Sequence, residues 1–294
     1  MSSPLMQVRL SAQYGKRCVL SQVQFDLCAG EALGMVGTSG AGKTTLVMAL
    51  LGLLPWRGGK ASGEVLIDGK NLLTMPASEA RKLRGKRIAL VPQSPMTALN
   101  PAVSLRSHFD EAWRAHESTG RRDLEMRLRQ LMDEVHLPAD DDSFLRRKPG
   151  QISVGQAQRV LIALALLHHP SILIADEPTS ALDPVTQAEI VKLLRHLNRR
   201  RGAALLYISH DLLSVLQLCD RLAVLHAGTI VDCVPVAHIQ EAHHPVTLSL
   251  LHALPVPVEI LLSHCGTVAA ELPKVLPFGT HTAPDQAEAS SGFH

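Results

Sequence analysis

The sequence contains few aromatic residues and almost no net charge. Aromatic residues make up 3% of its 294 positions, and 29 lysines and arginines stand against 27 aspartates and glutamates. Proteins that bind nucleic acid neutralise phosphates with clustered basic residues, and those that bind single strands also stack bases on aromatic rings. The composition therefore argues against nucleic acid as a partner.

Cysteine pairs, a signal-peptide pattern and long apolar runs are also missing. The five cysteines form no C-x-x-C pair, and the adjacent histidines at 168–169 and 243–244 lack the spacing of helical zinc ligands. We therefore expect neither a disulfide framework nor a structural metal site. The longest fully apolar run, residues 160–167, is too short to cross a bilayer, and the N-terminus lacks a basic-then-apolar layout. We expect a cytoplasmic protein that reaches any membrane through a partner.

What the sequence does contain is a phosphate-binding loop. Residues 37–44 fit the pattern G-x-x-x-x-G-K-[ST], after an apolar segment that predicts a strand and before one that predicts a helix. Glycines let backbone N–H groups turn toward phosphate oxygens, and the helix N-terminus adds about half a positive charge. Lys43 can neutralise the terminal phosphates, and the Thr44 hydroxyl can bind Mg²⁺. The residues expected to hold a nucleoside triphosphate are Gly37, Thr38, Ser39, Gly40, Ala41, Gly42, Lys43, Thr44 and Thr45.

Apolar segments alternate with helical ones along most of the chain. This alternation predicts an α/β fold with a parallel sheet covered on both faces. A helical block at about 102–168 interrupts the strands and predicts an inserted subdomain, and the last part of the chain, 261–294, lacks periodicity and should be a flexible tail. The predicted strands are 6–13, 32–36, 63–69, 86–91, 171–175, 203–208 and 221–225, and the predicted helices between the later strands are 184–200 and 211–218.

Two carboxylates, Asp176 and Glu177, end the predicted strand at 171–175. Because open α/β sheets bind ligands at the carboxyl ends of their strands, both should face the nucleotide. Asp176 would hold Mg²⁺, and Glu177 would polarise a water molecule for in-line attack on the γ-phosphate. A role in capping the following turn is the alternative, and the phosphate loop upstream favours catalysis.

With these residues and others in the expected order, the chain resembles the ATP-binding subunits of ATP-binding cassette (ABC) transporters. The resemblance covers about residues 6–232. It implies the P-loop ABC ATPase fold, with a mainly parallel sheet core, an N-terminal antiparallel β part and the inserted α-helical subdomain. It also implies ATP and Mg²⁺ as cofactors.

The resemblance assigns roles to single residues. Tyr14 would stack on adenine, although an ordinary strand tyrosine is an alternative. Gln93 would sense the metal and the attacking water, in a loop that touches the membrane subunit, and His210 would contact the γ-phosphate. Asp183 matches the family's D-loop. The signature segment, which in the family caps the ATP bound by the opposite subunit, is Ser153, Val154, Gly155 and Gln156.

The signature departs from the family's Ser-Gly-Gly-Gln at Val154. Valine keeps the backbone N–H, but it adds a β-branched side chain beside the phosphate and disfavours positive φ. Either valine is tolerated because Ser153 and Gly155 remain, or ATP hydrolysis is slow at the composite site, which is the site formed by this signature and the ATP bound to the opposite subunit.

Two shorter segments narrow the resemblance to the dipeptide, oligopeptide and nickel importers. Residues 93–101 resemble the segment after the family's glutamine loop, and 244–255 resemble the C-terminal His-Pro-Tyr-Thr motif, with Val246 in place of tyrosine. Peptide importers of this branch commonly carry a cysteine-rich C-terminal extension, whereas Cys265 stands alone after residue 233. This difference favours uptake of nickel or a metal chelate, with dipeptide or oligopeptide import as the alternative. Two further candidate functions are a soluble ABC ATPase outside transport and a nucleotide-gated module that hardly hydrolyses ATP.

The resemblance also predicts domains and partners. It divides the chain into an ABC ATPase domain at 1–233, with the glutamine loop and helical subdomain at about 94–168, and a C-terminal family extension at 234–260 before the tail. The implied partners are a second ABC ATPase subunit, identical or different, transmembrane permease subunits and an extracytoplasmic solute-binding protein. The expected location is the cytoplasmic face of the inner membrane.

Overall fold

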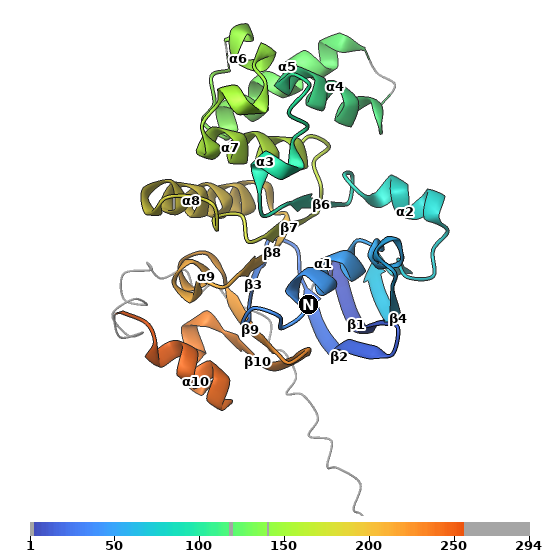
Figure 1. Cartoon of the computed structure of the whole chain (residues 1–294), viewed down its shortest axis with the longest axis vertical. Helices are drawn as coiled ribbons and strands as arrows, with labels where there is room; N and C mark the ends of the chain where they lie inside the picture. Colours follow the sequence, from blue (N-terminus) through green and yellow to red (C-terminus); the bar gives the residue numbers. More distant parts are fainter. Residues whose placement is uncertain (1–2, 118–119, 140, 256–294) are drawn as a thin grey trace, which may run out of the picture.

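Two β-sheets and the helices around them form the described part of the chain (Figure 1). The computed structural model describes residues 3–117, 120–139 and 141–255. The larger sheet has the strand order β10-β9-β3-β8-β7-β6, and the smaller sheet has the order β2-β1-β4-β5. Along the chain the strands are β1 (Met6–Tyr14), β2 (Arg17–Leu27), β3 (Ala32–Val36), β4 (Gly59–Ile67), β5 (Lys70–Asn71), β6 (Ile88–Val91), β7 (Ile172–Asp176), β8 (Ala204–Ser209), β9 (Arg221–His226) and β10 (Thr229–Pro235).

The helices differ in length from one turn to five. They are α1 (Lys43–Leu50), α2 (Ala77–Leu83), α3 (Pro95–Ala98), α4 (Leu105–Arg114), α5 (Arg121–Glu134), α6 (Asp142–Arg146), α7 (Val154–Ala165), α8 (Pro184–Arg201), α9 (Leu212–Leu218) and α10 (Pro245–His252). Single 3-10 segments lie at η1 (Leu54–Arg57), η2 (Pro149–Gln151) and η3 (Val236–Glu241). In the described part of the chain, no helix is both long and apolar enough to cross a membrane.

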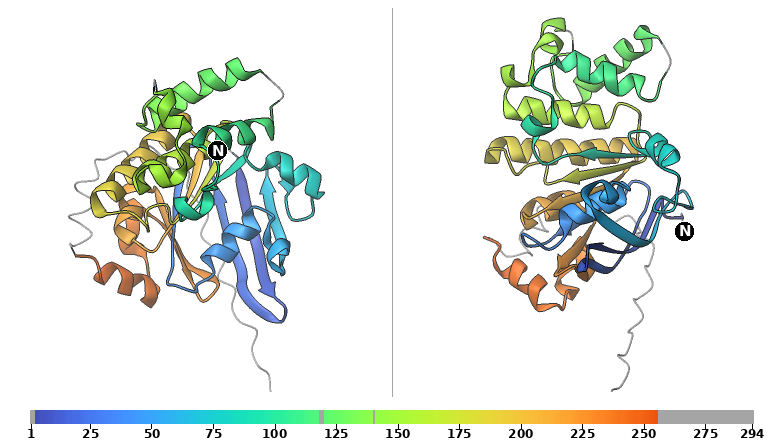
Figure 2. Two further views of the ribbon diagram at one scale, coloured as in Figure 1. Left: turned by 45° about the horizontal axis from the view of Figure 1, so that its top comes forward. Right: turned by 45° about the vertical axis from the view of Figure 1, so that its right-hand side comes forward.

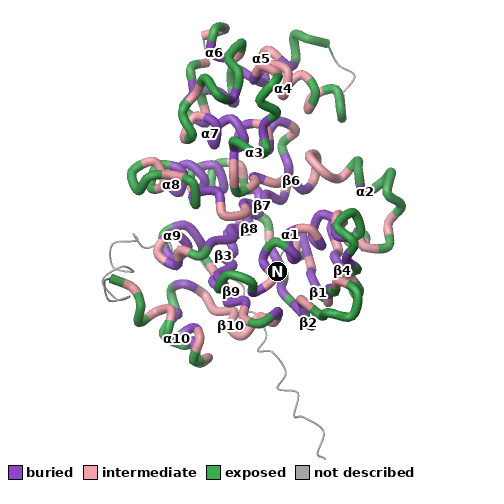
Figure 3. Tube along the Cα trace, in the orientation of Figure 1, coloured by how far each residue is buried: buried purple, intermediate pink, exposed green. Residues whose placement is uncertain are grey.

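The larger sheet is covered on both faces, as the continuous apolar strands predict. In β8, Leu205 and Tyr207 belong to one hydrophobic core with α7, α8 and α9, whereas Ala204, Leu206 and Ile208 belong to a second core with α1 and the smaller sheet. Buried residues accordingly concentrate in the central strands (Figure 3). Because β3, β6, β7, β8 and β9 run parallel, their carboxyl ends meet at one edge, and this edge positions the site.

The helical block lies at one end of the molecule. Helices α4, α5, α6 and α7 gather there in all the views (Figures 1 and 2), and their apolar faces bury Phe109, Leu131 and Phe144. A separate antiparallel sheet formed by β1, β2, β4 and β5 accompanies the mainly parallel one. This architecture has the mainly parallel sheet, the N-terminal antiparallel part and the inserted helical subdomain that we expected from the sequence.

The strands expected from the sequence are present, but it did not predict β2, β5, β10, α2, α3 or α10. Strand β2 lacks clean alternation because its pairing with β1 shifts between Leu10 and Ala12, opposite Gln22 at a φ of +47°. Strand β10 continues past residue 231 and helix α10 lies after it, where we expected regularity to fade. Strand β10 also runs across residue 233, the expected domain boundary, and residues 261–294 lie outside the described part of the chain.

Candidate nucleotide-binding and catalytic site

Glycines shape the loop between β3 and α1. Gly40 and Gly42 have φ values of +81° and +108°, in the left-handed region that residues with a Cβ rarely adopt. A Cβ at Gly37 would lie 2.6 Å from the backbone oxygen of Leu225, and one at Gly42 would lie 2.6 Å from the Leu20 side chain. The loop therefore turns tightly into α1, whose N-terminus has no side-chain cap. Its first amides are left available for an anion.

Lys43 is the buried cation of this loop, 9% exposed. Its Nζ donates to the backbone oxygens of Gly37 at 2.7 Å and Thr38 at 3.4 Å. The same Nζ lies 3.2 Å from Oε1 of Glu177. Of the other loop residues expected to hold phosphate, Thr38, Ser39, Gly40 and Thr44 are exposed, Gly42 is half-buried, and Gly37, Ala41 and Thr45 are buried.

Asp176 and Glu177 stand at the carboxyl end of β7. Burial and, as a smaller effect, the neighbouring charge of Glu177 together raise the pKa of Asp176 to about 6, although the Lys43 ammonium opposes both. Glu177 has a φ of +45°, a conformation that costs on the order of 1–3 kcal/mol in a residue with a Cβ. Its N–H donates to the oxygen of Ile208 at 2.8 Å, and its own oxygen accepts from Ser180 Oγ at 3.1 Å. This turn directs the carboxylate back toward Lys43.

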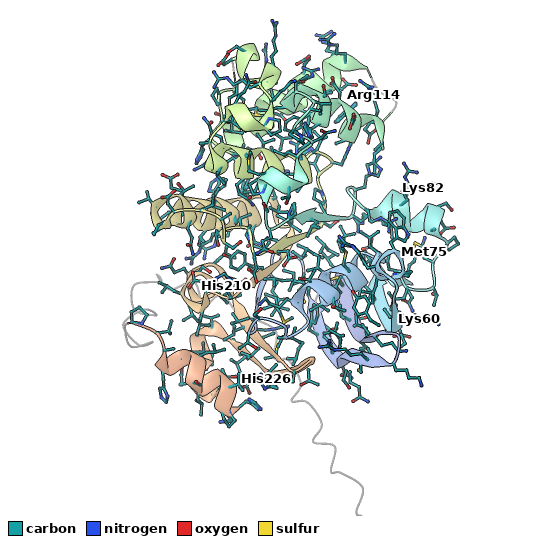
Figure 4. All side chains as sticks on the ribbon, in the orientation of Figure 1. Lys60, Met75, Lys82, Arg114, His210 and His226 are labelled. Carbon is teal, nitrogen blue, oxygen red and sulfur yellow. The ribbon has the colours of Figure 1, made fainter. Side chains whose placement is uncertain are left out.

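Gln93 and His210 contact the same carboxylate. Gln93 Nε2 donates to Oε2 of Glu177 at 3.3 Å, and His210 Nδ1 lies 3.1 Å from that oxygen. His210 stands just before α9 (Figure 4). Strands β3, β8, β7 and β6 are neighbours in the sheet, so the loops after them bring Lys43, His210, Glu177 and Gln93 together. Glu177 is the centre on which three other site residues converge.

Three oxygen donors expected to hold Mg²⁺ follow these strands: the Thr44 hydroxyl, the Asp176 carboxylate and the Gln93 amide oxygen. Such hard oxygen ligands suit Mg²⁺, which keeps several waters and is usually held by one or two carboxylates together with substrate phosphates. A cation beside Asp176 would also offset the burial and the like charge that raise its pKa. The residues present fit the ion.

The signature segment begins α7. Ser153 caps the helix by accepting from Gln156 N at 3.1 Å, and the Gln156 side chain accepts from Ser153 N at 3.0 Å. Val154 is the first helical residue and is 39% exposed. It does not adopt positive φ, so our backbone argument against valine at this position is wrong, and only its β-branched side chain distinguishes it from glycine.

The other two sites expected from the resemblance lie on separate elements. Asp183 caps α8 by accepting from Val185 N and Thr186 N, each at 3.1 Å, and its hydrogen bonds to Thr186 lower its pKa. Tyr14 ends β1 opposite Gly59 and packs, half-buried, against the core under the smaller sheet. Adenine stacking on Tyr14 stays a prediction.

Sequence reasoning missed the residues that hold the His210 loop. Asp211 accepts from Leu213 N at 3.0 Å and caps α9, and below it lie buried hydroxyl groups of Tyr207, Ser209 and Ser214. The capping residue had a detectable signal, an aspartate directly before a helix. The hydroxyl groups had none, because each is an ordinary strand or helix residue taken alone.

Comparisons with known proteins agree with this geometry. A family model described as ABC transporter matches residues 20–180. The chain is 37% identical over 254 residues to the probable D,D-dipeptide transport ATP-binding protein DdpD of Escherichia coli K12, covering 85% of this chain and 77% of that one. It is 36% identical over 251 residues to the oligopeptide transport ATP-binding protein OppD of the same organism, covering 85% and 74%. Among solved structures, it is similar to a dimeric ATP-binding cassette in a post-hydrolysis state bound to ADP and phosphate, with a TM-score of 0.67, 27% identity and 79% and 98% of the two chains covered.

Proposed function

The chain belongs to the ATP-binding subunits of ABC transporters and is an ATPase, and from this we propose that it energises uptake of dipeptides or oligopeptides through a membrane permease. The observation that carries the proposal is the convergence of Lys43, Gln93 and His210 on Glu177, in a chain whose relatives are named for dipeptide and oligopeptide transport.

Dipeptides or oligopeptides, which were the alternative cargo expected from the sequence, replace nickel in this proposal. The preference for nickel rested on a missing cysteine cluster, and the single cysteine that carried it, Cys265, lies outside the described residues. The named cargo of the similar proteins is peptidic. In the proposed transporter, the solute-binding protein and the permease recognise the cargo. One cysteine in the ATP-binding subunit is therefore a weak indicator of which cargo is transported.

We assign the chemical roles from the contacts around Glu177. Lys43 contacts Oε1 of Glu177, while Gln93 and His210 contact Oε2. Terminal phosphates of ATP would draw Lys43 away and free Oε1 to accept a proton from the attacking water. His210 and Gln93 would keep the carboxylate oriented, and Lys43 would neutralise charge on the phosphates. Mg²⁺, held by Thr44, Asp176 and Gln93, would supply further charge neutralisation.

We place the chain in a dimer at the cytoplasmic face of the inner membrane. The partner is a second ABC ATPase subunit, identical or different, and each signature serves the other subunit's ATP. Among the described residues, the side-chain hydrogen bonds of Ser153 and Gln156 stay within the start of α7 and none reaches the Glu177 cluster, which supports this arrangement. Permease subunits and an extracytoplasmic solute-binding protein complete the transporter, with the loop after Gln93 facing the permease.

Uptake of a labelled dipeptide and of labelled nickel, measured side by side in cells that depend on this chain, tests the cargo. Lys43→Ala should abolish dipeptide uptake, because it removes the cation that neutralises the phosphates. Lys60→Ala, a change at an exposed lysine of β4, should leave uptake intact and is the control. Loss of nickel uptake with dipeptide uptake unchanged would overturn the proposal.

Val154 raises a separate question about the composite site. Its side chain is exposed at the start of α7, where the family places the opposite subunit's ATP. We propose that this site is slower than its counterpart. In the complete transporter, Val154→Gly should raise ATP hydrolysis; an unchanged rate would show that valine is simply tolerated.

A further inference from the structure

The first turn of α8 lies in close contact with the start of α7. Asp183 Oδ2 accepts from Thr186 Oγ1 at 2.7 Å, which fixes the orientation of the Thr186 side chain. The Thr186 methyl group then occupies the space beside Gly155, where a Cβ would lie only 2.7 Å from it. A real Cβ does not approach a carbon so closely, so the glycine of the signature allows the two helix starts to meet.

The same turn reaches the loop that carries His210. Gln187 Nε2 donates to Oδ2 of Asp211 at 2.9 Å, and Asp211 directly follows His210. Gln187 is itself fixed in the turn, because its N–H donates to the backbone oxygen of Asp183 at 2.8 Å. One side chain of α8 therefore joins the first turn of this helix to the residue beside His210.

Asp211 is held from below by hydroxyl groups. Its N–H donates to Ser209 Oγ at 2.9 Å, and its backbone oxygen accepts from Ser214 Oγ at 2.8 Å. Tyr207, which is fully buried, donates to Ser214 Oγ at 3.2 Å. These contacts fix the backbone of the loop. The carboxylate, by contrast, bonds the N–H groups of its own helix and, among the described residues of other elements, the Gln187 amide.

We propose that Gln187 is a positioning residue for ATP hydrolysis, which holds the Asp211 carboxylate and so sets His210 against Glu177. This inference rests on the role proposed above for His210. The Gly155–Thr186 contact adds a consequence: displacement of this chain's signature, which serves the partner's ATP, moves the turn that positions the histidine serving its own ATP. The two composite sites are coupled through about one helical turn of α8.

The test exchanges the two polar partners in the full-length chain. Gln187→Leu removes the hydrogen bond, and Gln187→Glu sets a second carboxylate against Asp211. Combining Gln187→Glu with Asp211→Asn restores a hydrogen bond of reversed direction, from the asparagine amide to the new carboxylate, and asparagine still caps a helix. Gln217→Leu, at an exposed position of α9, is the matched control. The measurements are kcat and KM for ATP, together with Tm.

We expect kcat to fall about tenfold in Gln187→Leu, equivalent to about 1.4 kcal/mol, and further in Gln187→Glu. These losses are expected because 1 Å displacements near the chemistry are enough for large changes in rate. KM for ATP and Tm should stay near their original values. In the Gln187→Glu/Asp211→Asn double variant, kcat should recover to within about threefold of the original value. Equal losses in kcat, ATP affinity and Tm, or no recovery in the double variant, would overturn the positioning role. His210→Ala distinguishes failure of the proposed function from failure of this inference. If His210→Ala leaves ATP hydrolysis unchanged, the role proposed for the histidine is wrong. If His210→Ala loses hydrolysis while Gln187→Leu stays active, only the role of Gln187 is refuted.

Discussion

The ion pair between Lys43 and Glu177 should compete with the phosphates of ATP for Lys43. Nζ and Oε1 are 3.2 Å apart, and the two side chains are 10% and 15% exposed. In the proposed mechanism the same Nζ binds the phosphates, so we expect ATP to weaken the pair as it enters. Glu177→Gln keeps the size and a hydrogen-bond acceptor but removes the competing charge. We therefore expect this variant to lose hydrolysis and to bind ATP more tightly.

The size of the affinity gain follows from the geometry. At 3.2 Å and an effective dielectric constant of 20, the gross attraction of two unit charges is roughly 5 kcal/mol. Most of this is offset by the desolvation of both groups, and the glutamine oxygen retains a neutral hydrogen bond worth about 1 kcal/mol. A remaining difference of about 1–2 kcal/mol corresponds to a gain of about tenfold in ATP affinity. Loss of the proposed base should lower kcat by about a hundredfold to ten-thousandfold.

Titration calorimetry with ATP and a phosphate-release assay measure the two effects on the full-length chain. Glu189→Gln is the matched control, because Glu189 also forms an ion pair with a basic residue, Arg159, at 2.8 Å. Glu189 lies on α8, and its side chain is 56% exposed. It should change neither ATP affinity nor kcat. If Glu177→Gln binds ATP no more tightly than the original chain, Glu177 does not compete with ATP for Lys43 and the reasoning is refuted.

Three further predictions concern stability and are checked by urea denaturation. The rings of His116 and His168 lie 4.9 Å apart, and burial lowers the pKa of each below its usual 6.5. Because the unfolded chain then binds more protons, the free energy of unfolding should fall as pH falls through 6.5 and level off below the folded-state pKa values; a His116→Gln/His168→Gln variant that keeps the same step would contradict this. Gly42→Ala should lower the free energy of unfolding more than Gly40→Ala. Both positions have positive φ, which costs a residue with a Cβ about 1–3 kcal/mol, but only at Gly42 would the Cβ lie 2.6 Å from a side chain, that of Leu20. Equal losses would mean that the Leu20 side chain moves aside freely. Phe109→Ala, fully buried in the helical block, should lose about 3–5 kcal/mol, and a loss below 1 kcal/mol would show that the block collapses around the gap.

Patterns that depend on neighbouring residues could be read from the sequence. The phosphate-loop pattern needs glycines at fixed offsets between a strand and a helix, and the structure places residues 37–42 between β3 and α1. Asp176 likewise ends an apolar strand and Glu177 follows it, as the local pattern predicts. The segment after residue 231 could not be read in this way. Helix α10 is short, and its buried contacts, such as that of Thr247 with Asp232, come from the distant strand β10.

The sequence by itself determined which chemical groups the chain carries and the class of fold that holds them, because strand periodicity, glycine spacing and helix caps are local properties of the backbone. Only the tertiary structure decided which groups meet. Gln93 and His210 stand 84 and 33 residues from Glu177, and they share its carboxylate because β6, β7 and β8 are neighbours in one parallel sheet. The link from Gln187 to Asp211 likewise depends on how α8 packs beside the β8 loop. Such contacts arise from the packing of whole elements, which no local pattern of residues records.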